Sequence, residues 1–292
     1  MLRTTYRGRF APSPTGLLHA GSLATALASW LDAKAAGGIW LIRVEDLDTP
    51  RVQANAKEGI LQQLAVMGMT SDETIVYQSQ RIPLYQEALH QLNHAQLLYT
   101  CSCSRKKLSE LIVPQSLTSG TDLIYPGICR PQHPQSIPMI DSQGAIRVRI
   151  PINTHILGQN IFQEVGDFVL QRNDGIFNYQ LAVVVDDGYQ GITHVVRGGD
   201  LESNTPRQIW LQQQLGLPRP YYRHIPIVVN ESHEKLSKQT KAPPIWPQNT
   251  QEALYYLHAA GEHLGLGLEK PTPQMTIAQW QEQAIRAWSN LT

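Results

Sequence analysis

The stretch formed by residues 9–22, RFAPSPTGLLHAGS, limits the possible folds more than any other part of the sequence. It joins a predicted strand over residues 6–11 to a turn with two prolines and one glycine, and then to a predicted helix over residues 17–36. A helix N-terminus attracts phosphate through its N–H groups and its dipole, and His19 can donate a hydrogen bond to the same group. This corner is a candidate phosphate site, although strand-turn-helix corners are also common without a ligand.

A second predicted strand, residues 39–44, is apolar except for Arg43, as expected of a strand buried in a parallel sheet. Glu45 and Asp46 follow it at the carboxyl end, the edge at which open α/β sheets bind ligands. Glu45 is therefore placed to meet a cation such as the ammonium group of an amino acid. Acidic residues in this position also cap loops without any ligand, so the residues alone leave both interpretations open.

The other segments alternate between helical and extended patterns. Helices are predicted over residues 48–67, 80–99, 203–215, 251–264 and 277–288. Strands are predicted over residues 145–150, 193–197 and 222–229, with a hairpin over residues 168–177. Tyr179 opens a further apolar run, and we expect both it and Arg197 where loops leave the sheet edge. A tyrosine or an arginine there is often only a packing residue or a surface cation.

The three cysteines favour a metal site over disulfides, because an odd number cannot pair completely and Cys101 and Cys103 lie two positions apart. A structural zinc ion takes four ligands, so three thiolates leave one position open. His133, four residues after Cys129, is the fourth ligand that spacing favours. The alternative is that the cysteines bind no metal.

Positive and negative charges balance at 24 each, so overall charge gives no indication of nucleic-acid binding. The region of the cysteines is locally basic through Arg105, Lys106, Lys107, Arg130, Arg147 and Arg149. Such a cluster can contact a phosphate backbone, or it can be an ordinary solvated surface. No apolar run approaches the roughly 20 residues of a membrane span, and the N-terminus has no apolar signal segment. We therefore expect a cytoplasmic protein with no membrane partner.

Residues 9–22 resemble the first signature of class I aminoacyl-tRNA synthetases, whose HIGH motif corresponds here to residues 19–22. The whole phrase is most similar to the glutamyl branch of that class. Ser22 stands where the motif has its second histidine, so any role of that histidine is absent. Residues 235–239, KLSKQ, resemble the second signature, KMSKS. The order and separation of the two signatures match a synthetase catalytic core over roughly residues 5–240.

The resemblance implies which residues bind glutamate and ATP. RVEDLDTPR is similar to a segment whose glutamate, here Glu45, holds the substrate's amino group, and the segments at Tyr179 and Arg197 are similar to parts of the amino-acid pocket. The glutamate-binding set implied is Arg9, Phe10, Ala11, Pro12, Ser13, Glu45, Tyr179 and Arg197. The ATP-binding set implied is His19, Gly21, Lys235, Ser237 and Lys238. Of these, His19 and Lys238 are expected to be catalytic, by stabilising the phosphates. Asp200 is a further candidate near the nucleotide.

The pattern CSCS…YPGIC resembles short paralogues of the glutamyl synthetases, in which a tyrosine completes the metal site. The ligands implied for one structural zinc ion per chain are Cys101, Cys103, Tyr125 and Cys129. We follow this resemblance in preference to His133.

Only about fifty residues follow the core, enough for a small helical piece but not for a separate anticodon-binding domain. This combination is similar to the glutamyl-queuosine tRNA(Asp) synthetases. The resemblance implies an α/β fold: a class I synthetase Rossmann-like parallel sheet with a zinc-bearing insertion and a short helical C-terminal extension. The expected parts are residues 1–98 and 179–240 for the catalytic domain, 99–178 for the insertion and 241–292 for the extension.

The implied activity uses ATP with Mg²⁺ to activate L-glutamate as glutamyl-adenylate, and transfers glutamate to queuosine in the anticodon loop of tRNA(Asp). One alternative is a truncated glutamyl-tRNA synthetase that charges a tRNA 3′ end. The other is a non-catalytic paralogue that binds an amino acid or RNA. His19, Glu45 and Lys238 argue against the second alternative, because a binding module does not need residues that face phosphate.

Overall fold

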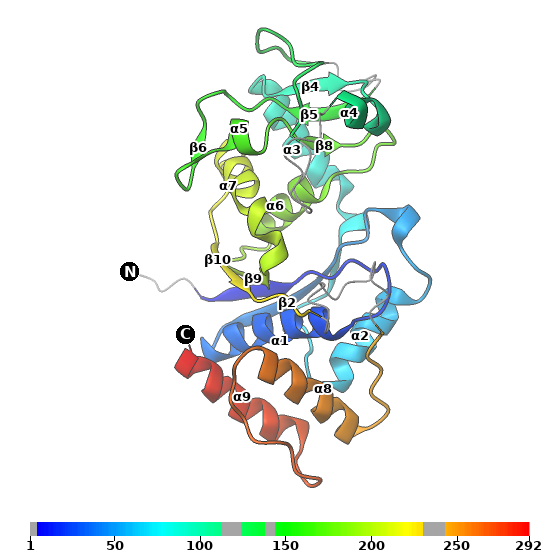
Figure 1. The fold of residues 1–292 in the computed structure, drawn as a ribbon, viewed down its shortest axis with the longest axis vertical. Coiled ribbons are helices and arrows are strands. Elements are labelled where there is room, and N and C mark those ends of the chain that lie inside the picture. Colours follow the sequence, from blue (N-terminus) through cyan, green and yellow to red (C-terminus); the bar gives the residue numbers. More distant parts are fainter. Residues whose placement is uncertain (1–4, 112–123, 138–143, 230–242, 292) are drawn as a thin grey trace. The chain divides into compact units, whose positions relative to one another are not determined.

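The computed structural model describes residues 5–111, 124–137, 144–229 and 243–291 (Figure 1). The chain forms two compact units. The first comprises Met1–Gln80, Gly191–Glu202 and Pro220–Thr292, and the second comprises Arg81–Gln190 and Ser203–Arg219. This division differs from the boundaries expected at residues 98 and 178, and the four functional parts stay a prediction.

The first unit contains parallel strands. The sheet β1 (Arg7–Phe10), β2 (Ile39–Val44) and β3 (Val76–Tyr77) is parallel throughout, and β9 (His194–Gly198) and β10 (Tyr221–Ile225) form a second parallel pair. The Thr193 N–H group donates to the Arg7 carbonyl oxygen at 2.9 Å, so β9 begins beside β1. The resulting strand order, β3-β2-β1-β9-β10, is that of a Rossmann-like sheet and confirms the expected fold.

Helix α1 (Ala20–Ala35) covers one face of these strands. Phe10, Ile42 and Val196 pack into the large apolar core with the helix. Successive side chains of a strand point to opposite faces, so the residues of odd number in these three strands lie on the other face, where Leu41 and Val195 form a separate small core. Arg9 and Arg197 belong to that second face.

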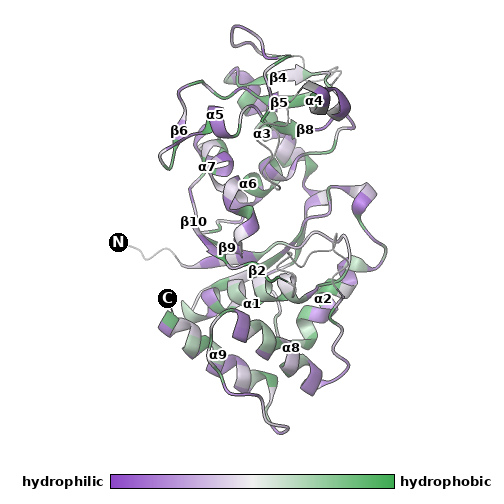
Figure 2. Ribbon diagram, viewed as in Figure 1, coloured by the Kyte–Doolittle hydropathy of each residue, from purple (hydrophilic) through white to green (hydrophobic). Residues whose placement is uncertain are grey.

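Two C-terminal helices, α8 (Thr250–His263) and α9 (Ile277–Leu291), complete the core around α1. Leu254, Leu257 and Trp280 are fully buried there. Figure 2 shows hydrophobic and hydrophilic residues in both helices, as expected of helices with one buried face. The predicted helical extension is therefore confirmed, and it packs on the sheet unit. Among the described residues, no helix is long and apolar enough to cross a membrane.

The second unit combines helices with a small antiparallel sheet. Its longer helices are α3 (Ile82–His94), α6 (Tyr179–Tyr189) and α7 (Thr205–Gln214), and its sheet is β4 (Leu98–Cys101), β5 (Ala145–Val148) and β8 (Val169–Gln171). Shorter elements are α4 (Arg105–Leu111), β6 (His155–Ile156), β7 (Gln159–Asn160) and α5 (Ile161–Glu164). The buried carboxylate of Asp186 joins α6 to α3, since it accepts hydrogen bonds from Arg81 at 2.6 Å and Tyr85 at 2.8 Å.

Two helix predictions were wrong in their extent, and the position expected for Tyr179 was wrong as well. Residues 48–67 form a 3-10 turn, Thr49–Arg51, and a separate helix α2, Ala56–Val66, because Asn55 has the left-handed φ of 61°. The helix expected over residues 80–99 ends at His94, and after Gln96, which has a φ of 57°, the chain continues as β4. Tyr179 begins α6, capped by Asn178, and does not follow a strand at the sheet edge.

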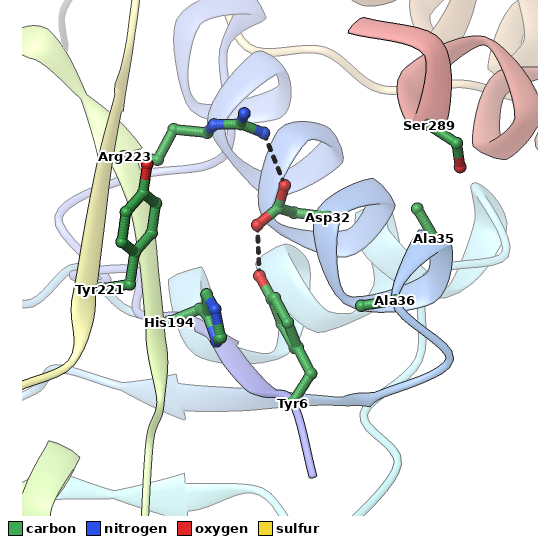
Figure 3. A pocket seen from close by; sticks show the side chains of 8 residues that line it. All are labelled: Tyr6, Asp32, Ala35, Ala36, His194, Tyr221, Arg223 and Ser289. Atoms are coloured by element: carbon green, nitrogen blue, oxygen red, sulfur yellow. Dashed lines mark hydrogen bonds and ion pairs between the residues drawn. The ribbon is translucent and has the colours of Figure 1, made fainter. Parts of the chain in front are cut away.

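A cavity of about 500 Å³ lies at the amino ends of β9 and β10, in the first unit (Figure 3). Asp32 of α1 dominates its chemistry, because this carboxylate accepts hydrogen bonds from Tyr6 at 2.5 Å and Arg223 at 2.7 Å. Its wall also includes His194, whose ring stacks on that of Tyr6. Among the described residues, no site residue expected from the sequence lines this cavity, and those on β1 and β9 lie toward the carboxyl ends of their strands.

Candidate active site and metal centre

The proline-rich turn after β1 is fixed by hydrogen bonds from two other segments. The Glu45 N–H group donates to the Pro12 carbonyl oxygen, and the Gln53 N–H group donates to the Pro14 carbonyl oxygen, each at 2.9 Å. Gly16 completes the turn with a φ of 138°, a conformation that favours glycine. The turn is thus held against the carboxyl end of β2, beside the residue expected to bind an ammonium group.

His19 is the N-cap of α1. Its Nδ1 atom accepts hydrogen bonds from the N–H groups of Gly21 at 3.2 Å and Ser22 at 3.4 Å, and the Ser22 hydroxyl accepts one from the His19 N–H group at 2.8 Å. Because Nδ1 is an acceptor, the ring proton lies on Nε2, which is the nitrogen that can donate to a ligand. Two of the N–H groups that we expected to face a phosphate instead face the histidine ring, so the ring itself offers the donor.

The second sheet face gathers charged groups at the carboxyl ends of its strands. Arg9 and Arg197 are 4% and 3% exposed, and Arg43 of β2 is fully buried. The Arg43 guanidinium lies 3.6 Å from the Glu45 carboxylate, whose side chain is 7% exposed. Buried guanidinium groups bind carboxylates well because their geometry allows two parallel hydrogen bonds. This face can therefore hold an anion beside a carboxylate that can hold a cation.

His224 orients one of these arginines. The Arg197 Nε–H group donates to His224 Nε2 at 3.2 Å, and its guanidinium lies over the Tyr222 ring, 5.0 Å from the centroid. Burial, and secondarily the charge of Arg197, lower the pKa of His224, which favours the neutral ring that accepts this hydrogen bond. Arg197 is thus fixed by two neighbours on β10.

Asp46 anchors the loop that carries Glu45. Its carboxylate accepts hydrogen bonds from the Lys57 ammonium group at 2.5 Å and from the backbone N–H and hydroxyl of Ser79, each at 2.8 Å. Burial acts to raise the pKa of Asp46, but these hydrogen bonds outweigh it and hold the pKa below its usual value. The loop is therefore tied to α2 and to the segment after β3.

The three cysteine sulfur atoms lie within 4.8 Å of one another in the second unit, so this cluster can hold a metal ion. Tetrahedral zinc with thiolate ligands requires sulfur atoms roughly 3.8 Å apart. The Cys103 and Cys129 sulfur atoms are 3.6 Å apart. Gly144, with a φ of 127°, passes so close to Cys101 that an added Cβ atom would lie 2.7 Å from its carbonyl oxygen.

Tyr125 reaches this cluster with its hydroxyl group. The hydroxyl oxygen lies 3.4 Å from the Cys101 sulfur atom and accepts a hydrogen bond from the Cys129 N–H group at 2.7 Å. A phenolate ligand of the same tetrahedral ion would lie roughly 3.5 Å from a thiolate sulfur atom, so the donor set fits zinc. His133 is exposed and is not part of the cluster. The arrangement favours tyrosine over histidine, against the spacing rule and in agreement with the resemblance.

Hydrogen bonds within the cluster favour the thiolate form of Cys129. Burial acts to raise the pKa of Cys129, but hydrogen bonds from Tyr125, the Ser102 backbone and the neighbouring thiols outweigh it and lower that pKa to about 7. A thiol with this pKa is readily available as thiolate, the form that binds metal.

A family model described as the catalytic domain of tRNA synthetases class I (E and Q) matches residues 5–246. The chain belongs to this family. Two relatives named glutamyl-Q tRNA(Asp) synthetase are each 48% identical to this synthetase. They come from Burkholderia cenocepacia, aligned over 97% of this chain and 96% of the relative, and from Cupriavidus metallidurans, aligned over 97% and 91%.

The fold is also found in solved structures. A crystal structure of a glutamate tRNA ligase from Elizabethkingia meningosepticum, in complex with its amino acid, matches with a TM-score of 0.72 and 25% identity. The match covers 97% of this chain and 64% of that longer one. The class I synthetase fold expected from the two signatures is thereby confirmed.

The remaining predicted site residues of this synthetase do not all lie on the sheet face that carries Arg9 and Arg197. Phe10 is buried in the core with α1, so its backbone and not its ring faces the turn. Tyr179 lies in the second unit, and its part in glutamate binding stays a prediction. Asp200 is exposed in the 3-10 segment Gly199–Asn204. The second signature, with Lys235, Ser237 and Lys238, lies outside the described residues.

Two arginines of the basic cluster of the synthetase pack inside the second unit instead of contributing to a surface patch. Arg130, whose side chain is 13% exposed, forms an ion pair with the buried carboxylate of Asp167 and lies over the Phe162 ring. Arg147 is also buried, donates to the Asp167 carbonyl oxygen at 2.8 Å, and stacks on the Tyr125 ring at 3.8 Å. These arginines pack beside the cysteine cluster through Tyr125 and Asp167, whereas Lys106 and Lys107 are exposed.

Sequence reasoning missed the residues that hold the synthetase's site together. Asp167 has no signature of its own, although it binds Arg130 and accepts a hydrogen bond from Tyr99 at 2.8 Å. Gln63 of α2 is 1% exposed and bonds to the backbone just before His19. The only signal for Gln63 is a glutamine on the apolar side of an amphipathic helix.

Proposed function

We propose that this synthetase activates L-glutamate with ATP and transfers it to queuosine in the anticodon loop of tRNA(Asp). The observation that carries the activation step is the placement of Arg9, Arg197 and Glu45. The two guanidinium groups would bind the side-chain carboxylate of glutamate, and Glu45 would bind its ammonium group. An amino acid with a second carboxylate suits this arrangement better than a neutral one.

In the first step, an oxygen of the glutamate α-carboxylate attacks the α-phosphorus of ATP. The bond from that phosphorus to the bridging oxygen breaks, which gives glutamyl-adenylate and pyrophosphate. His19 Nε2–H and Lys238 would stabilise the phosphate charge, and Mg²⁺ would accompany ATP. No side chain has to act as a nucleophile, so catalysis rests on positioning and charge.

In the second step, a hydroxyl group of queuosine attacks the carbonyl carbon of the anhydride, and AMP leaves. The relatives named glutamyl-Q tRNA(Asp) synthetase support this acceptor, because they match almost the whole chain at 48% identity. Cys101, Cys103, Cys129 and Tyr125 would hold one structural zinc ion, which takes no part in either step.

Exchange of labelled pyrophosphate into ATP tests the activation step. We expect exchange that depends on glutamate and is much weaker with glutamine. Lys238→Ala should reduce it about 100-fold, the usual loss when one transition-state contact is removed. A wild-type protein without exchange, with tRNA present or absent, would support a non-catalytic paralogue.

Labelled glutamate tests the acceptor. We expect label on tRNA(Asp) that contains queuosine, also after the 3′ terminal CCA has been trimmed, and no label on the same tRNA without queuosine. Label that disappears with the CCA and ignores queuosine would identify a truncated glutamyl-tRNA synthetase instead.

A further inference from the structure

Gln63 lies on the buried side of α2, and its amide bonds to backbone groups of two distant segments. The Oε1 atom accepts a hydrogen bond from the Leu18 N–H group at 2.9 Å. The Nε2 group donates to the Leu18 carbonyl oxygen at 3.3 Å and to the Ile245 carbonyl oxygen. One side chain therefore holds the residue that precedes His19 and a residue from the far end of the catalytic core.

These two segments are also bonded directly, since the Ile245 N–H group donates to the Leu18 carbonyl oxygen at 2.9 Å. Gly59, one helical turn before Gln63, lets the chain approach α2. A Cβ atom at this position would clash with the Leu17 side chain and lie 3.8 Å from the Trp246 ring. Helix α2 therefore packs closely against residues 17–18 and 245–246, and we call this contact the junction.

The junction lies next to both sequence signatures of the family. Leu18 directly precedes His19, the N-cap of α1, and Ile245 follows Lys238 by a few residues in the sequence. We propose that Gln63 is a positioning residue for ATP, which fixes the backbone before His19 and ties it to the segment that leads from the second signature. This inference rests on the proposed function, in which His19 and Lys238 contact the phosphates.

The chemistry of the amide explains why this position carries glutamine. The group must accept one hydrogen bond and donate two at the same time, which a carboxylate cannot do and a methionine side chain cannot replace. Asparagine has both functions, but it is one methylene shorter. A protonated glutamic acid, however, has a carbonyl oxygen that accepts and a hydroxyl group that can donate to one of the two carbonyl oxygens.

Two variants test this role, Gln63→Met and Gln63→Glu. We expect Gln63→Met to weaken the binding of the ATP analogue AMPPNP with Mg²⁺, and to lower glutamate-dependent pyrophosphate exchange about 10- to 100-fold, the loss that small displacements of catalytic groups cause. The affinity for glutamate alone should stay within about twofold of wild type, because α2 packs into the large core, on the sheet face opposite Arg9 and Arg197.

The pH profile separates positioning from simple destabilisation. Burial raises the pKa of a carboxylic acid at this position, so Gln63→Glu should regain AMPPNP affinity and exchange, relative to wild type, as the pH falls. Gln63→Met should show no such recovery.

Ser29→Ala is the matched control, because it also removes a buried hydrogen bond of the same unit, the one from the Trp40 indole to the Ser29 hydroxyl at 3.0 Å. All variants are compared below their melting temperatures, with folding checked by circular dichroism. We expect Ser29→Ala to lower the melting temperature and leave AMPPNP affinity unchanged. Equal AMPPNP affinity in Gln63→Met, Ser29→Ala and wild type would overturn the inference.

The nucleotide measurement also separates this inference from the proposed function. If wild-type protein binds AMPPNP but shows no exchange, the proposed activity is wrong, and the binding comparison still decides the role of Gln63. If exchange is normal in Gln63→Met, the activity stands and the positioning role is wrong.

Discussion

The sheet-face site of the first unit and the cysteine cluster of the second are built in opposite ways. Arg9, Glu45 and Arg197 come from segments far apart in the sequence, and they are placed by parallel strands over a large apolar core. The cysteine cluster takes its ligands from the end of β4 and one loop, over a core of only a few side chains around Tyr99. A site on a large core is formed before its ligand arrives, whereas a site on a small core needs its ligand for stability.

The largest effect should follow loss of the metal. Cys101→Ser removes one ligand, and structural zinc contributes on the order of 10 kcal/mol to small zinc domains. We expect metal analysis to fall from about one zinc per chain toward zero and the second unit to melt at a lower temperature. Pyrophosphate exchange should change little by comparison, since the sheet-face site lies in the other unit. If pyrophosphate exchange were lost to the same extent as the metal, the sheet-face site would not be independent of the cysteine cluster.

The fourth ligand can be identified in the same experiment. Tyr125→Phe removes the hydroxyl that touches the cluster, so it should weaken zinc binding more than His133→Ala does. Competition with a chelator gives the ranking. The reverse order would show that the spacing argument was right and the tyrosine has only a structural part.

The second largest effect concerns Arg130, next to Cys129 of the cysteine cluster. Arg130→Met leaves the Asp167 carboxylate, which is 2% exposed, without its ion-pair partner. Breaking a buried pair in this way costs about 3 to 5 kcal/mol, which urea denaturation can measure. Lys106→Met is the control because its side chain is exposed, and it should change stability by less than about 0.5 kcal/mol. Similar losses in both variants would contradict the buried role of Arg130.

The third effect measures the sheet-face site directly. Glu45→Gln keeps the size of the side chain and removes its charge, so the glutamate ammonium group loses its partner. We expect kcat/KM for glutamate to fall about 100-fold or more, within the range for a buried charge pair that loses one member. Glu73→Gln is the matched control, since Glu73 lies in the same unit and is 48% exposed. Activity that survives in Glu45→Gln would place the ammonium group elsewhere.

The sequence predicted β1, β2 and β9 well, because a buried parallel strand leaves a continuous apolar run, but it missed β3, and the strand expected over residues 222–229 ends at Ile225. Residues 39–44 coincide with β2, and the run before Arg197 coincides with most of β9. The run from Tyr179 has the same composition and is a helix, since Asn178 caps it and its Val residues pack inside the second unit. Apolar composition alone does not distinguish a buried strand from a buried helix.

The ends of the helices and the burial of the basic residues could not be predicted, because they depend on backbone conformations and tertiary contacts that the sequence pattern does not reveal. Asn55 and Gln96 interrupt helical patterns by left-handed backbone conformations, which residues other than glycine adopt rarely. Arg130 and Arg147 appeared to be surface charges because their partner, Asp167, lies far along the chain and is brought in by folding. The site residues expected on the sheet face come from motif positions, and their roles stay a prediction, whereas the residues that hold them in place have no motif.

The smallest effect is a pH dependence of the first unit, and it tests whether the loop that carries Glu45 is pre-formed. Because the folded-state pKa of Asp46 lies below its usual value, the stabilisation is fully present above the unfolded-state pKa of about 3.9 and is lost as the pH falls through the folded-state value. We expect Asp46→Asn to lose about 1 to 2 kcal/mol at pH 7, the range for hydrogen bonds to a charged group. The difference from wild type in urea denaturation should shrink below about pH 4.

Asp174→Asn, which removes an exposed carboxylate paired with Arg172, is the control and should show little change at either pH. A difference that persists unchanged at low pH would mean that Asp46 holds the loop without its charge. The pre-formed character of the sheet-face site would then come from the backbone hydrogen bonds of Pro12 and Pro14 alone.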